Sequence, residues 1–271
     1  MNEVQYARYR RQILLPALGE IGQQRLINAR VLIIGIGGLG SAVAMYLAAA
    51  GVGHLTLSDY DQVDLSNLQR QIAHRTADVG RLKVDSARDA LLALNPEVEV
   101  IVIPHALDGM KLIEVVNHHD LVVDACDNFE TRFLLNRACF VTSKPLVSGA
   151  AMGFNGQVAV FFHRSVAPCY QCLYPNDETP GETCTHQGIL APLAGIVGSV
   201  QATEALKILT GIGQPLIGRL LLLDALTVEW RVLRVLRDPA CPTCGHNQLS
   251  SSISGAETPG LSHGEEAPSS C

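Results

Sequence analysis

A glycine-rich turn directly after an apolar run constrains the fold of this chain more than any other feature. Val31-Leu32-Ile33-Ile34 is followed by Gly35-Ile36-Gly37-Gly38-Leu39-Gly40, and an alanine-rich helical pattern continues from Ser41 to Ala50. This is the order of a Rossmann βα turn, in which glycines let the backbone approach a phosphate at the amino end of a helix. The usual cofactor of such a turn is NAD, so the residues beyond it decide which nucleotide we expect.

Apolar runs that alternate with helical patterns extend this turn into a sheet. Strands are expected at 31–34, 55–58, 98–103 and 121–125, and helices at 41–50, 83–94, 107–116 and 130–141. Strands that are largely apolar are typical of a parallel sheet with helices on both faces. The pattern predicts an α/β fold with a Rossmann-like, doubly wound, mostly parallel sheet.

The second half of the chain predicts antiparallel strands added to that sheet. Strands are expected at 145–147, at 157–162, at 219–223 and where Val228, Trp230 and Val232 alternate. Between them Pro192 opens, and Gly211 closes, a long helix. The segment 164–187 is rich in proline, cysteine and charge, and is expected to be a crossing loop.

The composition indicates a globular protein, with 48% apolar and 17% charged residues. No apolar run reaches the roughly 18 residues that span a bilayer, and residues 1–12 lack the apolar core of a secretion signal. We therefore expect a cytoplasmic protein with no membrane partner. The net charge of −6 argues against a nucleic-acid partner, because phosphate contacts need a basic face. Residues 1–246 are expected to form a single domain, followed by a disordered tail at 247–271.

Two Cys-x-x-Cys pairs predict a structural metal site. They are Cys169 with Cys172, and Cys241 with Cys244. Four thiolates in two such pairs complete the tetrahedral shell of Zn²⁺ and leave no open position for catalysis. Two redox dithiols are the alternative, although a second matched pair is hard to explain by redox chemistry. A zinc ion here would tie the crossing loop to the C-terminal strand.

Three further cysteines have different expected roles. Cys126 and Cys139 lie within or beside apolar elements and are expected to be buried as small hydrophobic side chains. Cys184 lies in a polar stretch, where a nucleophile and an inert loop cysteine are both open interpretations.

Polar side chains after the second strand indicate a ligand with more phosphate than NAD carries. Asp59 follows that strand, where a carboxylate can accept hydrogen bonds from ribose hydroxyls. Asn67 and Arg70 are one helical turn apart, and Lys83 begins the next helix. An amide, a guanidinium and an ammonium group can together bind several phosphate oxygens. A solvated charged turn is the simpler alternative.

Two carboxylates lie at the end of the fourth strand, on the edge where ligands bind in this class of fold. They are Asp124 and Asp127. One of them could hold Mg²⁺ against a phosphate. The alternative is that Asp127 and Asn128 belong to the cap of the helix that follows.

Taken together, these pieces resemble the MoeB/ThiF/HesA family of ubiquitin-activating-enzyme-like adenylyltransferases. The matching segments are residues 8–12, 35–40, 59, 66–71, 83, 124–128 and 148–151, and both cysteine pairs. They occur in family order from Arg8 to Gly245, and the strongest likeness is to the molybdopterin-synthase branch.

The resemblance implies that ATP activates the C-terminal glycine carboxylate of a small ubiquitin-like sulfur-carrier protein ending in Gly-Gly. The products would be an acyl-adenylate and pyrophosphate. The implied ATP site consists of Gly35, Gly37, Gly38, Gly40, Asp59, Ser66, Asn67, Arg70, Lys83, Asp127 and Asn128. Among these, Asp127 would hold Mg²⁺, and Arg70 and Lys83 would bind phosphates in catalysis.

The resemblance also implies partners. A homodimer would let Arg11 reach the phosphates of the neighbouring subunit's ATP, and the helix with Gly195, Gly198 and Ser199 would suit the dimer surface. Sulfur would come from a separate donor, such as a cysteine desulfurase or a rhodanese.

Two alternative functions remain open at this point. The first is a thiamine-pathway adenylyltransferase in which Cys184 forms a covalent link to the carrier. The second is an NAD-dependent Rossmann oxidoreductase, which leaves Arg70, Lys83 and Asp127 without a role.

Overall fold

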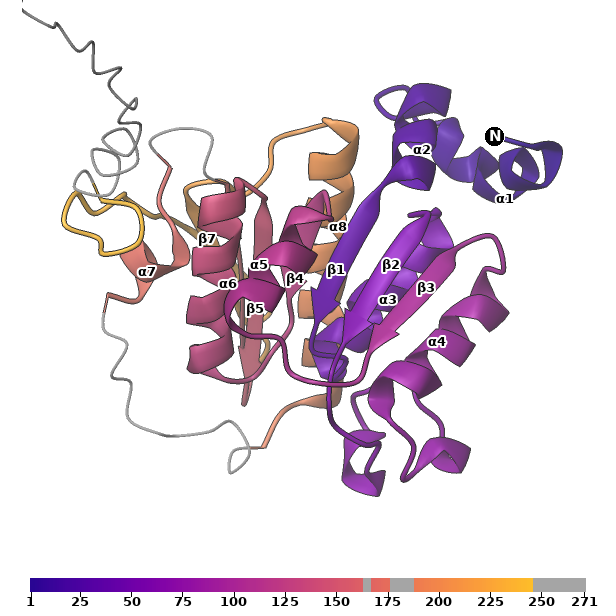
Figure 1. Cartoon of the computed structure of the whole chain (residues 1–271), viewed down its shortest axis with the longest axis horizontal. Coiled ribbons are helices and arrows are strands. Elements are labelled where there is room, and N and C mark those ends of the chain that lie inside the picture. The colour runs from indigo at the N-terminus through magenta and orange to yellow at the C-terminus, as the bar shows by residue number, and fades with distance from the viewer. Residues whose placement is uncertain (163–166, 176–187, 246–271) are drawn as a thin grey trace, which may run out of the picture.

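An eight-stranded sheet organises the computed structural model, which describes residues 1–162, 167–175 and 188–245 (Figure 1). The strand order is β3-β2-β1-β4-β5-β6-β7-β8. The parallel strands are β1 Arg30–Ile34, β2 His54–Ser58, β3 Glu99–Ile103, β4 Leu121–Asp124 and β5 Leu146–Met152. The antiparallel strands are β6 Asn155–Phe161, β7 Arg219–Asp224 and β8 Glu229–Arg234. The predicted Rossmann-like sheet with antiparallel additions is confirmed.

The strand order reverses beside β1, which places a crevice at its carboxyl end. Ile34, the last residue of β1, pairs with Ser58 of β2 on one side and with Asp124 of β4 on the other. The chain leaves these strands in opposite directions, so the loops diverge and leave room for a ligand.

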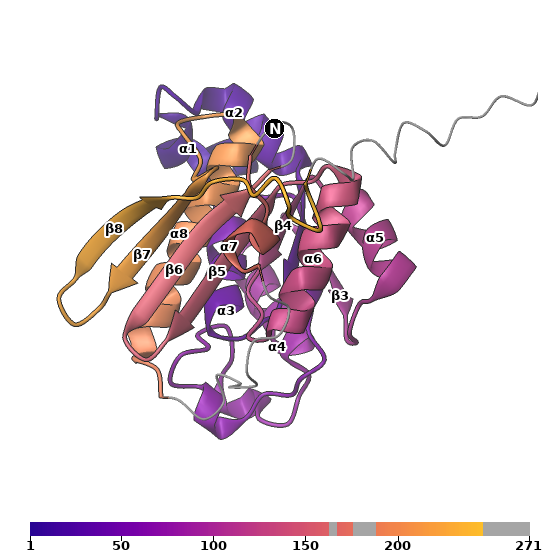
Figure 2. The same cartoon turned by 90° about the vertical axis from the view of Figure 1, so that its left-hand side faces the viewer.

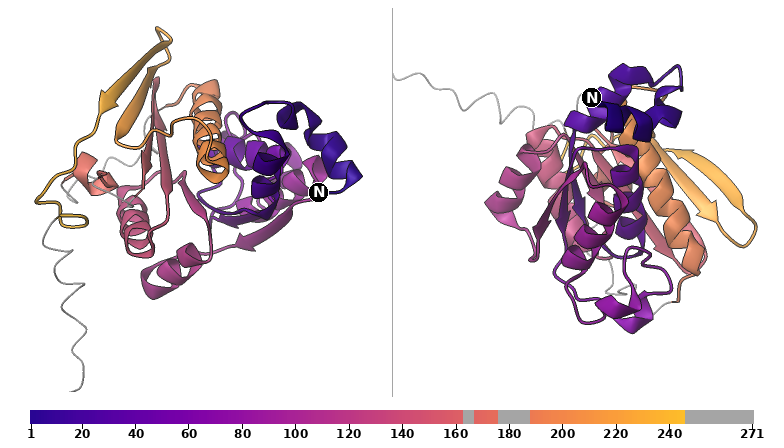
Figure 3. Two further views of the ribbon diagram at one scale, coloured as in Figure 1. Left: turned by 90° about the horizontal axis from the view of Figure 1, so that it is seen from above. Right: turned by 90° about the vertical axis from the view of Figure 1, so that its right-hand side faces the viewer.

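Helices cover both faces of the sheet (Figure 3). One face carries α3 Gly38–Ala50, α4 Lys83–Leu94 and α8 Ala191–Thr210, and the other carries α5 Gly109–Asn117 and α6 Phe129–Thr142. Alternate residues of β1 point to opposite cores: Val31 and Ile33 face the first group of helices, and Leu32 and Ile34 face the second. Both faces of the central strands are covered, which explains why the parallel strands are largely apolar.

Two helices near the amino terminus were not predicted. They are α1 Glu3–Ile13 and α2 Gly19–Asn28. Their polar sequences show little apolar periodicity, and a long-range contact fixes α1 instead: Tyr9 is buried, and its hydroxyl accepts a hydrogen bond from Asn95 Nδ2 at 2.9 Å. The crossing loop also contains a short helix, α7 Tyr170–Leu173, within its described part.

Two glycines of α8, Gly195 and Gly198, lie in different environments. A Cβ at Gly198 would lie 2.5 Å from the carbonyl oxygen of Leu39, so this glycine lets α8 approach α3. A Cβ at Gly195, in contrast, would have no heavy atom of the described residues within 4 Å beyond its own helix backbone. Gly198 is therefore buried against α3, and the expected dimer surface on α8 stays a prediction. Within the described residues, every helix is too short or too polar to span a bilayer.

Candidate active site

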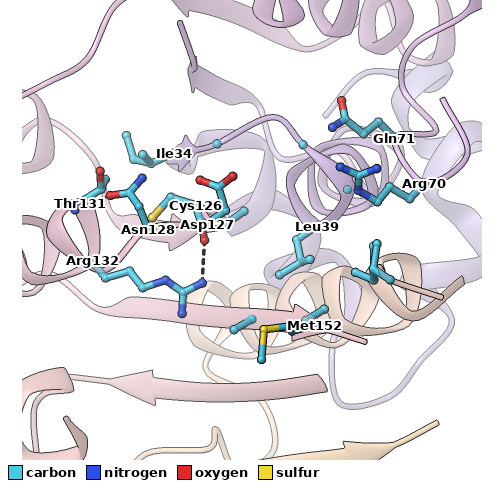
Figure 4. Close-up of a pocket in the computed structure, with 18 of the residues that line it drawn as sticks. Ile34, Leu39, Arg70, Gln71, Cys126, Asp127, Asn128, Thr131, Arg132 and Met152 are labelled. Carbon is cyan, nitrogen blue, oxygen red and sulfur yellow. Dashed lines mark hydrogen bonds between the residues drawn. The ribbon is translucent and has the colours of Figure 1, made fainter. Parts of the chain in front are cut away.

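A cavity of about 1290 Å³ opens at the carboxyl ends of the central strands (Figure 4). It brings together most of the residues that the sequence assigns to nucleotide binding, although they come from separate segments. Those that line it are Gly35, Gly37, Gly38, Asp59, Ser66, Asn67, Arg70, Lys83, Asp127 and Asn128. Gly40 and Arg11 do not line it.

The glycine turn forms the floor of the cavity, and three of its four glycines have a steric reason. Gly35 has a φ of +88°, and a Cβ there would lie 2.7 Å from the carbonyl oxygen of Ala125. A Cβ at Gly38 would lie 2.8 Å from that of Ala194 in α8. Gly40 is buried, with 1.9 Å between its hypothetical Cβ and the carbonyl oxygen of Gly35. Gly40 therefore packs α3 against the turn and does not itself line the cavity, and its expected role in nucleotide binding stays a prediction.

Asp59 connects the end of β2 to this turn. Its Oδ2 accepts a hydrogen bond from the Ile36 amide at 2.7 Å, and its Oδ1 accepts one from the Asp61 amide at 2.8 Å. Burial raises the pKa of Asp59, and nearby Lys83 opposes that increase. A carboxylate can accept about four hydrogen bonds, so Asp59 retains capacity for ribose hydroxyls.

Lys83 is held over the cavity by a partner that the sequence analysis did not single out. Its side chain is buried, and its Nζ lies 2.7 Å from Oδ2 of Asp61. The backbone of Lys83 also donates to the Asp61 carbonyl at 2.9 Å. Asp61 therefore positions the ammonium group beside Asp59. The Asp-Tyr-Asp sequence after β2 was the available signal.

The polar segment after β2 is a short 3₁₀ turn, η1 Leu65–Asn67. Asp64 caps it, accepting hydrogen bonds from the amide of Ser66 at 2.8 Å and from its hydroxyl at 2.5 Å. Asn67 Oδ1 in turn accepts from the Asp64 amide at 3.3 Å. The Ser66 hydroxyl is therefore already used within the turn. The Asn67 amide nitrogen has no such local partner among the described residues.

Arg70 and Gln71 follow this turn and lie against the glycine turn (Figure 4). Arg70 Nη1 donates to the Ser66 carbonyl at 3.3 Å, which leaves its other donors available to the cavity. Gln71 is only 3% exposed, and its Oε1 has no hydrogen-bond partner in the described residues. Leaving a buried amide oxygen without a hydrogen bond costs free energy. A polar ligand bound in the cavity could donate that hydrogen bond to Gln71.

The two carboxylates near the end of β4 have different environments. Asp124 is fully buried and accepts hydrogen bonds from the Ser148 hydroxyl and the Cys126 thiol, both at 2.6 Å. Asp127 is exposed to the cavity and has no hydrogen bond or ion pair within the described part of the chain. The helix cap belongs to Asn128, whose Oδ1 accepts from the Thr131 amide at 2.9 Å. Asp127 is therefore the carboxylate free to bind a ligand.

Arg132 supports the backbone under Asp127 and was also missed from the sequence. It is buried, and its Nη2 donates to the carbonyls of Cys126 at 2.6 Å (Figure 4) and Gly149 at 3.0 Å. Its Nε lies 3.9 Å from Asp124. Arg132 thus ties the end of β4 to β5. Its position one helical turn after Asn128, facing the sheet, was the available signal.

Cys126 and Cys139 are confirmed as buried or partly buried side chains. Cys139 is buried in the core, and Cys126 is partly buried at the cavity. Burial and the neighbouring Asp124 raise the pKa of the Cys126 thiol well above its usual value. Cys126 is therefore held as a thiol rather than as a reactive thiolate.

The four paired cysteines converge into one cluster beside α7. The Sγ atoms of Cys169, Cys172, Cys241 and Cys244 all lie within 4.8 Å of one another. The Cys169–Cys241 and Cys172–Cys244 sulfur distances are 3.5 and 3.4 Å. These exceed the roughly 2.05 Å of a disulfide and approach the roughly 3.8 Å edge of a tetrahedron around Zn²⁺. The donor set therefore fits zinc.

Neighbouring groups contact these thiols. The hydrogen bond between Cys169 and Cys172 raises the pKa of the Cys169 thiol and lowers that of Cys172. The Asp238 amide donates to Cys172 Sγ at 3.4 Å, and Asn136 Nδ2 donates to Cys169 Sγ at 3.7 Å. Figure 2 shows how the chain after β8 returns across the end of the sheet to α7, so the cluster joins distant segments.

One predicted catalytic residue, Arg11, does not line the cavity of its own chain; it lies exposed near the end of α1. The prediction for Cys184 lies outside the described residues, as does the predicted tail at 247–271.

The glycine turn, the polar cavity and the strand reversal beside β1 define a nucleotide-binding α/β protein of the Rossmann-like class. The chain belongs to the ThiF family, whose model matches residues 9–243.

Similar proteins agree with this assignment. The chain is 46% identical over 245 residues to the molybdopterin-synthase adenylyltransferase of Escherichia coli K12, covering 90% of this chain and 98% of that protein. It is 48% identical over 244 residues to the sulfur carrier protein adenylyltransferase of Thermus thermophilus, covering 88% and 90%. It is also similar in fold to E. coli MccB with MccA-N7isoASN, with a TM-score of 0.78, 24% identity and 88% and 75% of the two chains covered.

Proposed function

We propose that this protein adenylylates the C-terminal glycine carboxylate of a small ubiquitin-like sulfur-carrier protein of the molybdopterin-synthase type. Relatives that share nearly half of its residues are named as adenylyltransferases of molybdopterin synthase or of a sulfur carrier protein. In this proposal residues 1–246 act as one ATP-binding domain.

The extent of the cavity carries this proposal. Its volume of about 1290 Å³ exceeds the roughly 300–1,000 Å³ of a pocket for a small molecule alone. Beyond the nucleotide-binding residues it continues past Ala150, Ala151 and Gly156 of β5 and β6 to the β7–β8 hairpin. The small side chains of these three residues leave room for the backbone of a glycine-rich carrier terminus. An NAD-dependent oxidoreductase would have no use for such an extension.

The residues of the cavity suit transfer to the α-phosphate of ATP. A carboxylate oxygen of the carrier forms the new bond to the α-phosphorus, and the bond to the bridging oxygen of pyrophosphate breaks. Arg70, Lys83 and Asn67 would stabilise the negative charge of the phosphates, and Asp59 would bind ribose. Asp127 would hold Mg²⁺, which neutralises charge on the phosphates. Catalysis of this kind depends mainly on alignment and charge stabilisation.

A homodimer and a separate sulfur donor complete the proposal. Arg11 is exposed on α1 and lies away from its own cavity, so it would serve the partner subunit's nucleotide. The proposed site is compatible with cytoplasmic chemistry, where the zinc thiolates stay reduced.

ATP–pyrophosphate exchange tests this function. The full chain would be mixed with labelled pyrophosphate, ATP, Mg²⁺ and purified carriers of the molybdopterin-synthase and thiamine types. We expect exchange with the molybdopterin-type carrier and none with the same carrier lacking its last glycine. Exchange only with the thiamine-type carrier would reject the proposed substrate, and no exchange together with tight NAD binding would reject the proposed reaction.

A further inference from the structure

A second cavity lies at the opposite end of the β7–β8 pair from the nucleotide cavity. It has a volume of about 570 Å³, and its charged lining residues are Arg219, Arg234 and Arg237. The cross-strand pair Asp224–Glu229 lines the nucleotide cavity, whereas Arg219 pairs with Arg234 at the other end of the same ladder. Within the described structure the lining of this second cavity contains no carboxylate, although the whole chain has a net charge of −6.

The three guanidinium groups lack a charged partner in the described residues. Arg219 and Arg234 lie directly opposite each other, an arrangement in which like charges destabilise a sheet. Arg219 Nη2 donates only to the neutral carbonyls of Gln214 and Pro215, at 3.1 and 3.0 Å. Arg237 donates to the Cys244 carbonyl, while its Nε is buried without a hydrogen-bond partner. This arrangement fits a carboxylate ligand that bridges the arginines.

The chain itself supplies a segment of matching chemistry that begins at this cavity. The described structure ends at Gly245, one residue after the Cys244 carbonyl that Arg237 binds. Residues 246–271 contain Glu257, Glu265 and Glu266, and no lysine or arginine. The cavity also exposes two apolar side chains, Val232 and Leu236, and the segment contains Leu249 and Ile253.

We propose that residues 246–271 bind back to the arginine cavity through their glutamates. Charge-assisted hydrogen bonds between carboxylates and guanidinium groups would satisfy the unpartnered donors. The tether is long enough, because about 20 residues can span roughly 70 Å when extended. It also raises the local concentration of glutamate to the order of millimolar, so weak individual contacts suffice. The bound segment would cover the exposed end of β8.

Carbodiimide cross-linking of the full-length Arg234→Lys variant tests the proposal. This substitution keeps the positive charge at an exposed site and supplies an amine. Carbodiimide joins an amine to a touching carboxylate as an amide, and takes up the released water as urea. We expect mass spectrometry to find position 234 joined to Glu257, Glu265 or Glu266 of the same chain, independently of protein concentration. Yield should fall several-fold at about 0.5 M salt, because the contacts are exposed to screening.

Exposed Lys111 on α5 provides the internal control, because a segment that only diffuses would couple to it as well. Replacing the three glutamates by glutamine should abolish the cross-link at position 234. The proposal would be overturned by equal coupling to Lys111 or by coupling only between chains. In a second reaction an unrelated acidic protein is added, and coupling only to that protein would also overturn the proposal.

Trp230 gives a second measurement on the unmodified chain. It is the single tryptophan of the sequence and lies on the same face of β8 as Arg234, four residues away. We expect added salt to shift its emission in the native chain and to leave it unchanged in the variant with three glutamines. Identical salt responses in both would count against the segment.

Discussion

At the scale of single residues, the site depends on which polar groups are left without partners. Asp124 and Asp127 are three residues apart and chemically identical, yet one is buried in a hydrogen-bond network and the other faces the cavity. The sequence pattern alone offered both carboxylates and the family resemblance selected Asp127, but the physical reason depends on Ser148 and Arg132 from other elements. Asp61, Gln71 and Arg132 were missed for the same reason.

Replacing Asp127 by asparagine should remove activity without harming the fold. Its carboxylate has no partner in the described residues, so we expect an unchanged free energy of unfolding. The variant loses the carboxylate proposed to hold Mg²⁺ beside the charged transition state. The rate of ATP–pyrophosphate exchange should therefore fall by about 100-fold or more. ATP–pyrophosphate exchange and urea unfolding check the two halves of this prediction.

Asp124→Asn is the matched control. It should destabilise the protein, because Asp124 accepts hydrogen bonds from Ser148 and Cys126 in a fully buried position. Retained exchange in the Asp127→Asn protein would mean that the metal is held by another group.

At the scale of elements, the order of the strands and of the longer helices after β1 could be predicted, and the contacts between them could not. The helix expected at 83–94 is observed as α4 Lys83–Leu94, because proline after Asn95 and a clear apolar face mark it locally. The strand expected at 145–147 is observed as β5 Leu146–Met152, since its second half is glycine and alanine held by pairing with β6. Close helix packing at Gly198 was also invisible in the sequence.

Alanine substitutions at two glycines of α8 should change stability in opposite directions. Gly198→Ala should destabilise the protein by about 1–3 kcal/mol, because its Cβ would meet the Leu39 carbonyl at 2.5 Å. Gly195→Ala should stabilise it by up to about 1 kcal/mol, because the site is open and alanine favours a helix. Urea midpoints of both variants measure the difference. Destabilisation by Gly195→Ala would show that another surface covers this position.

At the scale of the whole molecule, buried polar residues connect distant elements. His74 bridges the Ser86 hydroxyl at 2.9 Å and the Ile36 carbonyl in the glycine turn at 3.1 Å. His119 similarly bridges Thr56 of β2 at 2.8 Å and the Val115 carbonyl at 2.6 Å. In its neutral form each ring donates to the carbonyl through one nitrogen and can accept from the hydroxyl through the other.

Acidification should destabilise the protein through these histidines. Burial lowers the pKa of both His74 and His119 in the folded state. The unfolded chain, with histidine pKa values near 6.5, therefore binds protons first as the pH falls. The contribution of these histidines to the free energy of unfolding should be complete above about pH 6.5 and should decrease toward about pH 5.

Urea unfolding above about pH 6.5 and again at about pH 5 measures this loss of stability. The His74→Gln variant should lose less stability on acidification than the native chain. An equal loss in the two proteins would assign the acid sensitivity to other groups.

The sequence alone determined the order of the strands, the glycine turn, the two cysteine pairs and the family. These follow from local patterns: apolar periodicity, the φ and space that glycine permits, and the spacing of thiols. Tertiary structure decided that Asp127 is the free carboxylate, that Lys83 rests on Asp61, and that Gly40 packs and does not line the cavity. These outcomes depend on atoms from distant segments that meet only when burial brings them together, so no local pattern encodes them.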